Sequence, residues 1–211
     1  MSSTFDGFNR LKKTERLKAG ERVTVEYVYD GDDLRTRKTV HSSAAGYEAQ
    51  VTNYYYDRQH VILETNGADQ ASVRYARGLN YIARIDAAAG RLSYFLYNGH
   101  GDVVQTVSET GDVENQYDYD VFGNPTLTME TEYTTAIRSA GEFYDVEVGL
   151  YYLRARYYKP YTGRFISEDS YWGEDTNPLS LNLYTYAHNN PILYVDPTGH
   201  SAKKINDIIQ Q

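Results

Sequence analysis

A short pattern repeats along the first two thirds of the chain and restricts what it can fold into. Each copy has alternating Tyr and β-branched residues, then Asp or Asn, a turn that usually contains Gly, and a second alternating run. A period of two places one face of a strand against a core, and Asp, Asn and Gly tolerate the left-handed angles of tight turns. The pattern therefore predicts successive β-hairpins. The copies lie at residues 5–11, 29–35, 56–62, 97–104 and 119–125.

Other features agree with an all-β chain. Further hairpin turns are expected at residues 66–67, 89–90 and 110–112. The chain has 23 Tyr against 6 Phe and 1 Trp, which favours strands whose aromatic side chains are half buried with the hydroxyl near a polar partner. Helical periodicity is nearly absent before residue 200. We therefore predict a long antiparallel meander of short strands.

A dense run of aromatic, Arg, Gly and Asp residues follows the repeats. Its blocks are Ser-Ala-Gly-Glu-Phe-Tyr-Asp at 139–145, Gly-Leu-Tyr-Tyr-Leu-Arg-Ala-Arg-Tyr-Tyr at 149–158, Gly-Arg-Phe-Ile-Ser-Glu-Asp at 163–169, Asn-Leu-Tyr-Thr-Tyr at 182–186, Asn-Asn-Pro at 189–191 and Asp-Pro-Thr-Gly at 196–199. In order and spacing this run resembles the core domain associated with RHS (YD-repeat) proteins. The earlier copies look like YD repeats, so the resemblance covers nearly the whole chain.

The resemblance implies an architecture. In RHS proteins, successive hairpins form a strip of sheet that spirals into a hollow shell, and the core domain closes it. We therefore expect an all-β antiparallel strip, part of a spiral shell or open barrel. The expected domains are YD repeats at 1–138, the core at 139–199 and a short tail at 200–211. The implied partners are upstream YD repeats and a C-terminal effector, which the tail is too short to contain.

The resemblance also implies a reactive site. In self-cleaving members, an Arg and two aspartates cut the chain just after the Asp-Pro-x-Gly motif; the matching residues are Arg156, Asp169 and Asp196, and the bond is near Gly199–His200. Two carboxylates held close cannot both ionise cheaply, so one can act as an acid while the other activates water. The alternative is that both aspartates cap turns and Arg156 is their salt-bridge partner.

Two residues next to this site depart from the family pattern. Asp169 is followed by Ser170, where Pro is frequent, and the Asp-Pro-Thr-Gly motif is followed by His200, where cleaving members typically have an apolar residue. Both differences bear on the geometry beside the expected scissile bond.

Three functions follow from these observations. The first is structural: a shell segment that encloses and presents a C-terminal effector. The second is a single-turnover, aspartyl-type autoprotease, with no enzymatic activity on other molecules. The third is a module that binds a surface glycan through exposed tyrosines. Packing across strands is the alternative explanation of the tyrosines, because adjacent side chains in a strand point to opposite faces.

Composition excludes several other classes. The net charge of −8 argues against a nucleic-acid partner. There are no cysteines, and the five histidines show no metal-ligand spacing, so neither a metal nor another cofactor is expected. No apolar run approaches the ~20 residues that span a bilayer. The N-terminus lacks a signal pattern. The family is secreted or displayed at the cell surface, so we expect this chain in the cytoplasm unless it is exported within a larger system.

Overall fold

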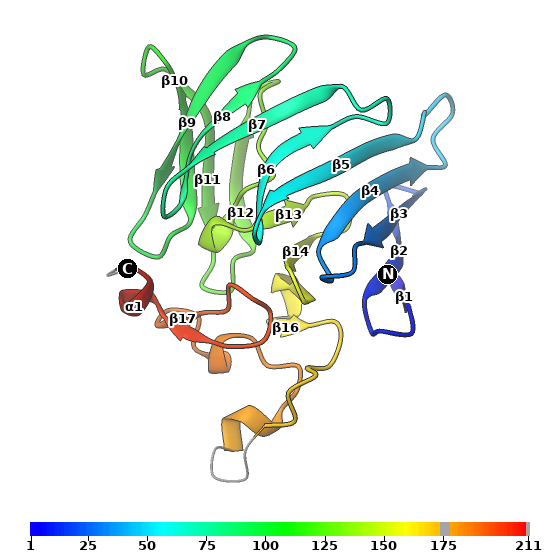
Figure 1. Cartoon of the computed structure of the whole chain (residues 1–211), viewed down its shortest axis with the longest axis vertical. Helices are drawn as coiled ribbons and strands as arrows, with labels where there is room; N and C mark the ends of the chain where they lie inside the picture. Colours follow the sequence, from blue (N-terminus) through cyan, green and yellow to red (C-terminus); the bar gives the residue numbers. More distant parts are fainter. Residues whose placement is uncertain (174–177, 210–211) are drawn as a thin grey trace. The chain divides into compact units, whose positions relative to one another are not determined.

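The computed structural model describes residues 1–173 and 178–209 and is almost entirely antiparallel β-structure (Figure 1). Twelve strands follow one another in chain order in the largest sheet. They are β1 (Ser2–Phe5), β2 (Leu11–Lys18), β3 (Glu21–Tyr29), β4 (Arg35–Ser42), β5 (Gln50–Asp57), β6 (His60–Thr65), β7 (Ala71–Arg77), β8 (Tyr81–Asp86), β9 (Arg91–Tyr97), β10 (Val103–Ser108), β11 (Val113–Tyr119) and β12 (Pro125–Glu130).

Shorter elements follow in the core region. A four-stranded sheet contains β13 (Phe143–Asp145), β14 (Leu150–Leu153), β15 (Arg156–Lys159) and β16 (Arg164–Phe165), in that order. The strands β17 (Tyr194–Val195) and β18 (Lys203–Lys204) form a separate pair. Four 3-10 turns, η1 (Ser139–Gly141), η2 (Pro160–Thr162), η3 (Pro178–Leu181) and η4 (Ala187–Asn189), and one helix, α1 (Ile205–Ile209), complete the described elements. The all-β prediction is confirmed.

The chain divides into two compact units. The first contains Met1–Ser93 and Val146–Val148, and the second contains Tyr94–Asp145 and Gly149–Gln211. In the first unit, each strand from β1 to β8 pairs antiparallel with the next. In the second unit, β10, β11 and β12 pair in the same way. The predicted boundary at residue 138 stays a prediction.

The Tyr-Asp pair makes two kinds of hydrogen bond in the repeats, one within its own loop and one to an earlier strand. In the loop after β3, the Asp30 carboxylate accepts hydrogen bonds from the N–H groups of Asp32 and Leu34, at 3.0 and 2.9 Å. Asp carboxylates close the loops after β1 and β11 in the same way. The preceding Tyr29 hydroxyl donates to the carbonyl of Leu11 at 2.7 Å, at the start of β2. Buried polar groups need such partners, so the pair fixes both its own loop and a strand before it.

Aromatic packing holds the core of the second unit together. All four residues of β14 are buried, so both faces of this strand are covered. Tyr151 lies in a buried cluster with Tyr158 and Tyr186, whose rings stack at 3.9 Å. Tyr152 instead contacts Tyr157, at 5.3 Å between ring centroids. Neighbouring tyrosines thus pack into different clusters, as expected for cross-strand packing.

The end of the described chain is short and regular. Val195 of β17 pairs with Lys203 of β18, and α1 follows directly. Ile205, Ile208 and Ile209 have helical spacing, and α1 contains all three. The side chains of Ile208 and Ile209 lie outside the described residues. Among the described residues, no helix is long and apolar enough to cross a membrane.

Candidate functional site

Arg156 lies at the centre of the predicted site. It begins β15, is only 5% exposed, and packs its guanidinium on the ring of Phe165 at 3.7 Å. Its Nη2 lies 2.6 Å from Asp169 Oδ2 and 3.7 Å from Asp196 Oδ2. Burial lowers the pKa of Arg156, and the two carboxylates oppose that change. An Arg stays protonated in proteins, so one buried cation holds both predicted aspartates.

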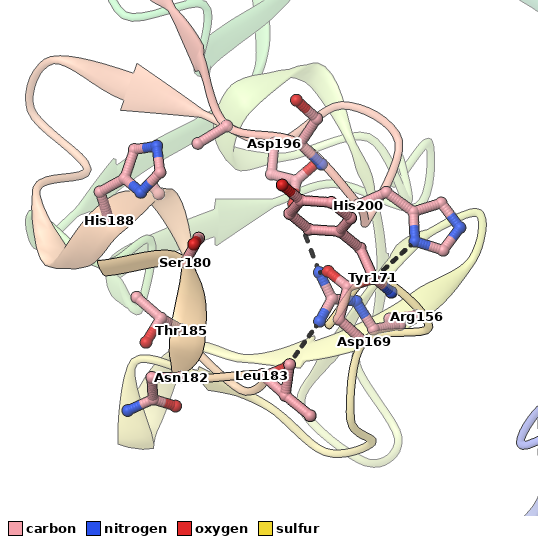
Figure 2. Close-up of a pocket in the computed structure, with 13 residues that line it drawn as sticks. Arg156, Asp169, Tyr171, Ser180, Asn182, Leu183, Thr185, His188, Asp196 and His200 are labelled. Atoms are coloured by element: carbon pink, nitrogen blue, oxygen red, sulfur yellow. Dashed lines mark hydrogen bonds and ion pairs between the residues drawn. The ribbon is translucent and has the colours of Figure 1, made fainter. Parts of the chain in front are cut away.

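The same guanidinium contacts the Gly199–His200 peptide bond, where cleavage is expected. Arg156 Nε donates a hydrogen bond to the carbonyl of Gly199, and Nη1 donates to the carbonyl of Leu183 at 2.8 Å. The structure therefore brings Arg156, Asp169 and Asp196 together next to His200 (Figure 2). Arg156 also contacts the carbonyl of the Gly199–His200 peptide bond.

Asp196 organises the loop that contains this bond. It is 4% exposed and follows β17. Its Oδ1 accepts hydrogen bonds from the N–H groups of Gly199 at 2.9 Å and Ser201 at 3.0 Å. These two donors are on either side of His200, so the Asp196 carboxylate holds the chain in a fixed turn across the predicted cleavage position.

The turn between β14 and β15 holds the loop from the other side. Arg154 donates to the carbonyl of Pro197 at 2.6 Å and forms an ion pair with Glu142. Gly199 has φ +77°, and a Cβ on it would lie 2.5 Å from the carbonyl oxygen of Leu153. Only glycine fits this position without movement of the neighbouring backbone. This explains why the Asp-Pro-Thr-Gly motif ends in glycine.

Asp169 has partners on both carboxylate oxygens. Oδ2 binds Arg156, and Oδ1 accepts hydrogen bonds from His200 Nδ1 at 2.9 Å and from the N–H of Tyr171 at 3.1 Å. Burial by itself raises the pKa of Asp169, but the hydrogen bonds from His200 and Tyr171 and the charge of Arg156 outweigh it, so the pKa is lowered. Asp169 is therefore a carboxylate at neutral pH and can accept a proton.

A pocket of about 250 Å³ adjoins these groups. Its walls include Arg156, Asp169, Asp196 and His200, together with polar side chains from residues 180–188 (Figure 2). Trp172 is 79% exposed and does not line the pocket. His188 lines it and packs edge-on against Tyr194, at 5.3 Å between ring centroids. Within the described residues, no group of three or more acidic or histidine side chains is placed to hold a metal ion.

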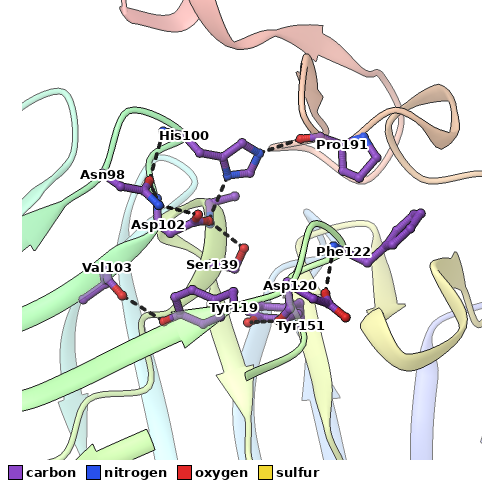
Figure 3. A network of polar contacts seen from close by, with 12 residues as sticks. Asn98, His100, Asp102, Val103, Tyr119, Asp120, Phe122, Ser139, Tyr151 and Pro191 are labelled. Atoms are coloured by element: carbon purple, nitrogen blue, oxygen red, sulfur yellow. Dashed lines mark hydrogen bonds and ion pairs between the residues drawn. The ribbon is translucent and has the colours of Figure 1, made fainter. Parts of the chain in front are cut away.

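A second polar network lies in the same unit (Figure 3). His100 Nδ1 is 2.9 Å from Asp102 Oδ1, and His100 Nε2 is 2.7 Å from the carbonyl oxygen of Pro191. A carboxylate and a carbonyl only accept, so both ring nitrogens must carry protons for both bonds to form. Ser139 Oγ donates to the same Asp102 oxygen at 2.7 Å rather than to the imidazole. The arrangement is a connection between loops, not a nucleophile with its base.

Sequence reasoning missed the partners in both networks. His200 was noted as a departure from the family pattern, but not as a ligand of the Asp169 carboxylate. The Gly-His-Gly-Asp stretch at 99–102 lies in the repeat copy at 97–104 and forms a turn, but the contact of His100 with Pro191 spans 91 residues of sequence.

A strip of antiparallel strands with loops closed by Tyr-Asp pairs, followed by a core of short strands, is the architecture expected of a YD-repeat shell segment. The family comparison agrees: the Teneurin YD-shell model matches residues 3–192, and the chain belongs to this family. The resemblance to RHS proteins is thereby confirmed.

Individual relatives are much longer than this chain. It is 37% identical over 201 residues to the tRNA(Glu)-specific nuclease WapA of Bacillus subtilis subsp. natto, a match that covers 93% of this chain and 8% of WapA. It is 48% identical over 67 residues to the toxin protein Tse5 of Pseudomonas aeruginosa, covering 30% of this chain and 4% of Tse5.

Solved structures share the fold. The crystal structure of TcdB2-TccC3 matches with a TM-score of 0.72 at 24% identity, over 93% of this chain and 10% of that one. The Tc holotoxin pore of Photorhabdus luminescens matches with a TM-score of 0.74 at 23% identity, over 95% of this chain and 10% of that one.

Proposed function

We propose that this chain is a wall segment of a hollow YD-repeat shell that encloses and presents a C-terminal effector within a toxin-delivery protein. The observation that carries the proposal is the continuous strip of antiparallel strands, with loops closed by Asp carboxylates, that leads into the buried core. β1 is the first strand in the sheet order, so its outer edge is where an upstream repeat would pair. Two relatives are named as a nuclease and a toxin, which supports the delivery role. The chain matches only 8% and 4% of their lengths, so most of each relative lies outside the matched segment.

This proposal names partners and a location. The partners are upstream YD repeats and a C-terminal effector, and the chain leaves the producing cell as part of a longer exported protein. A chimera tests it. This chain replaces the matched 8% of the Bacillus WapA relative, and tRNA cleavage and growth inhibition are measured. We expect both to be retained. A stable, exported chimera without either activity would contradict the proposal.

A second function is favoured by the contacts of Arg156. We propose that the core cleaves its own chain once, at the Gly199–His200 bond. Arg156 polarises the Gly199 carbonyl, Asp169 is the base, and Asp196 holds the loop by accepting hydrogen bonds on either side of the bond. A preorganised cation at a carbonyl oxygen stabilises the charge that develops there during hydrolysis.

The step balances as ordinary hydrolysis. A water oxygen bonds to the Gly199 carbonyl carbon while Asp169 takes one water proton, and the carbonyl electron pair moves to the oxygen beside Arg156. Collapse of this intermediate breaks the C–N bond, and Asp169 returns its proton to the departing nitrogen of His200. The products are a new α-amine on His200 and a Gly199 carboxylic acid, which passes its remaining water proton to that amine and becomes a carboxylate.

The intact mass of the purified protein tests this second function. We expect the wild type to lose residues 200–211, and Asp169→Asn and Asp196→Asn to retain them. Asp118→Asn is the matched control, because Asp118 is an exposed aspartate on β11, and it should be cut like the wild type. If every variant keeps all 211 residues, Asp169 and Asp196 are turn and ion-pair residues and the cleavage proposal fails.

A further inference from the structure

His200 contacts the base that would cut its own peptide bond. Its Nδ1 lies 2.9 Å from Asp169 Oδ1 (Figure 2), although its side chain is 46% exposed and the two residues are 31 positions apart in the sequence. Asp169 is ionised, so Nδ1 must carry the proton in this contact. Among the residues that the structure describes, the other titratable or charged groups that line the same pocket are Arg156, Asp196, Tyr171 and His188.

The contact between His200 and Asp169 occupies a lone-pair site on the carboxylate that must accept the water proton during hydrolysis. Each carboxylate oxygen has two lone-pair sites. Both sites of Asp169 Oδ1 are taken, by His200 Nδ1 and by the Tyr171 N–H, while Oδ2 forms an ion pair with Arg156. A carboxylate that accepts two hydrogen bonds and is paired with a guanidinium binds a further proton weakly, which makes it a poor general base.

We propose that His200 is a built-in brake on self-cleavage: its imidazole N–H occupies Asp169 Oδ1, so hydrolysis of the Gly199–His200 bond waits until this contact opens. The inference rests on the cleavage proposed above and identifies the residue that sets its rate. The exposed side of the ring lets the contact open by rotation of the side chain, without unfolding of the loop.

Cleavage also removes His200 from the site. His200 is the first residue of the released segment, so it departs with the product. When the water proton has passed through Asp169 to the new amine, the carboxylate is again ionised, and Arg156 still binds it. His200 is therefore a positioning residue that acts through Asp169 and exchanges no proton with the reacting atoms.

Two substitutions at one position separate the contact from the size of the side chain. His200→Asn places an amide N–H where Nδ1 lies and keeps the hydrogen bond, whereas His200→Leu has no donor. Each variant and the wild type are made by cell-free synthesis, and the fraction that has lost residues 200–211 is followed with time by mass spectrometry. We expect His200→Leu to be cut on the order of tenfold faster, and His200→Asn to be cut at about the wild-type rate.

The outcomes distinguish the brake from the cleavage itself. If the wild type is cut and His200→Leu is cut no faster, cleavage stands and the brake is wrong. If no variant loses the tail, the cleavage proposal fails and the brake fails with it. A separate measurement uses the Asp196→Asn background, where the Asp169 carboxyl is titrated by NMR. The pKa of Asp169 should be higher when the His200→Leu substitution is added to this background than when His200 is kept, and equal values would overturn the brake.

Discussion

Asp102 provides the sharpest test of the contacts in the second unit. Its carboxylate accepts hydrogen bonds from Ser139 Oγ at 2.7 Å, Ala140 N at 2.8 Å, Asn98 Nδ2 at 2.8 Å and His100 Nδ1 at 2.9 Å. Replacement by Asn keeps the size but removes the charge and one of the two acceptor oxygens. An asparagine cannot accept all four bonds, so Asp102→Asn should loosen the connection between the loops.

The magnitude follows from the pKa of Asp102. Burial by itself raises this pKa, but the surrounding donors, His100 first, lower it from 3.8 to about 2. At 1.36 kcal/mol per pKa unit, this difference corresponds to about 2 kcal/mol of stability at pH 7. Because the folded-state pKa is lowered, the contribution is present above the unfolded value near 3.8 and is lost as the pH falls through about 2.

Urea denaturation, followed by near-ultraviolet circular dichroism of the tyrosines, measures the effect. We expect Asp102→Asn to lower the free energy of unfolding by about 2 kcal/mol at pH 7 and by about half of that at pH 3. The exposed Asp118→Asn is the control and should change it by less than about 0.5 kcal/mol. An Asp102→Asn difference that is equally large at both pH values would refute the assignment to the charge of this carboxylate.

Three further changes test other contacts. Gly199→Ala puts a Cβ 2.5 Å from a backbone carbonyl at φ +77°; it should lower stability by about 1–3 kcal/mol in urea denaturation, and an unchanged midpoint would contradict this. Tyr56→Phe removes the hydroxyl bond to the Arg35 carbonyl at 2.7 Å and should cost about 1 kcal/mol in the same assay, more than the exposed Tyr55→Phe. The hydrogen bond to Asp102 raises the pKa of His100 above 6.5. In thermal melts, the wild type should therefore be more stable than His100→Leu at pH 5.5, and this difference in stability should decline as the pH rises through the folded-state pKa of His100. A difference that grows with pH would contradict the prediction.

The repeats show how far the sequence alone could be followed. The order of Tyr, Asp and Gly predicted strands and turns because alternation and turn chemistry act within a few residues. It did not predict that the Tyr29 hydroxyl would donate to Leu11, 18 residues earlier. That bond depends on how β3 lies beside β2, and strand register is set by packing as well as by the turns.

The candidate site divides in the same way. The family resemblance, rather than the spacing, selected Arg156, Asp169 and Asp196. The structure adds that one guanidinium binds both carboxylates and the Gly199 carbonyl. It also adds His200, which the sequence marked only as an unusual residue after the motif. Whether two side chains 31 residues apart meet depends on the intervening loops, for which no local rule exists.

The sequence by itself determined that this chain is an antiparallel β-protein of the YD-repeat type, because its periodicity and turn residues are local properties. Only the tertiary structure decided which polar groups share a site. It placed Arg156 between two aspartates in a buried environment, where charges and hydrogen bonds are strong enough to change pKa values. It also joined His100 to Pro191 across 91 residues. Such contacts arise because packing of the aromatic core brings distant loops within hydrogen-bonding distance. The spatial distance between two loops cannot be calculated from their separation in the sequence.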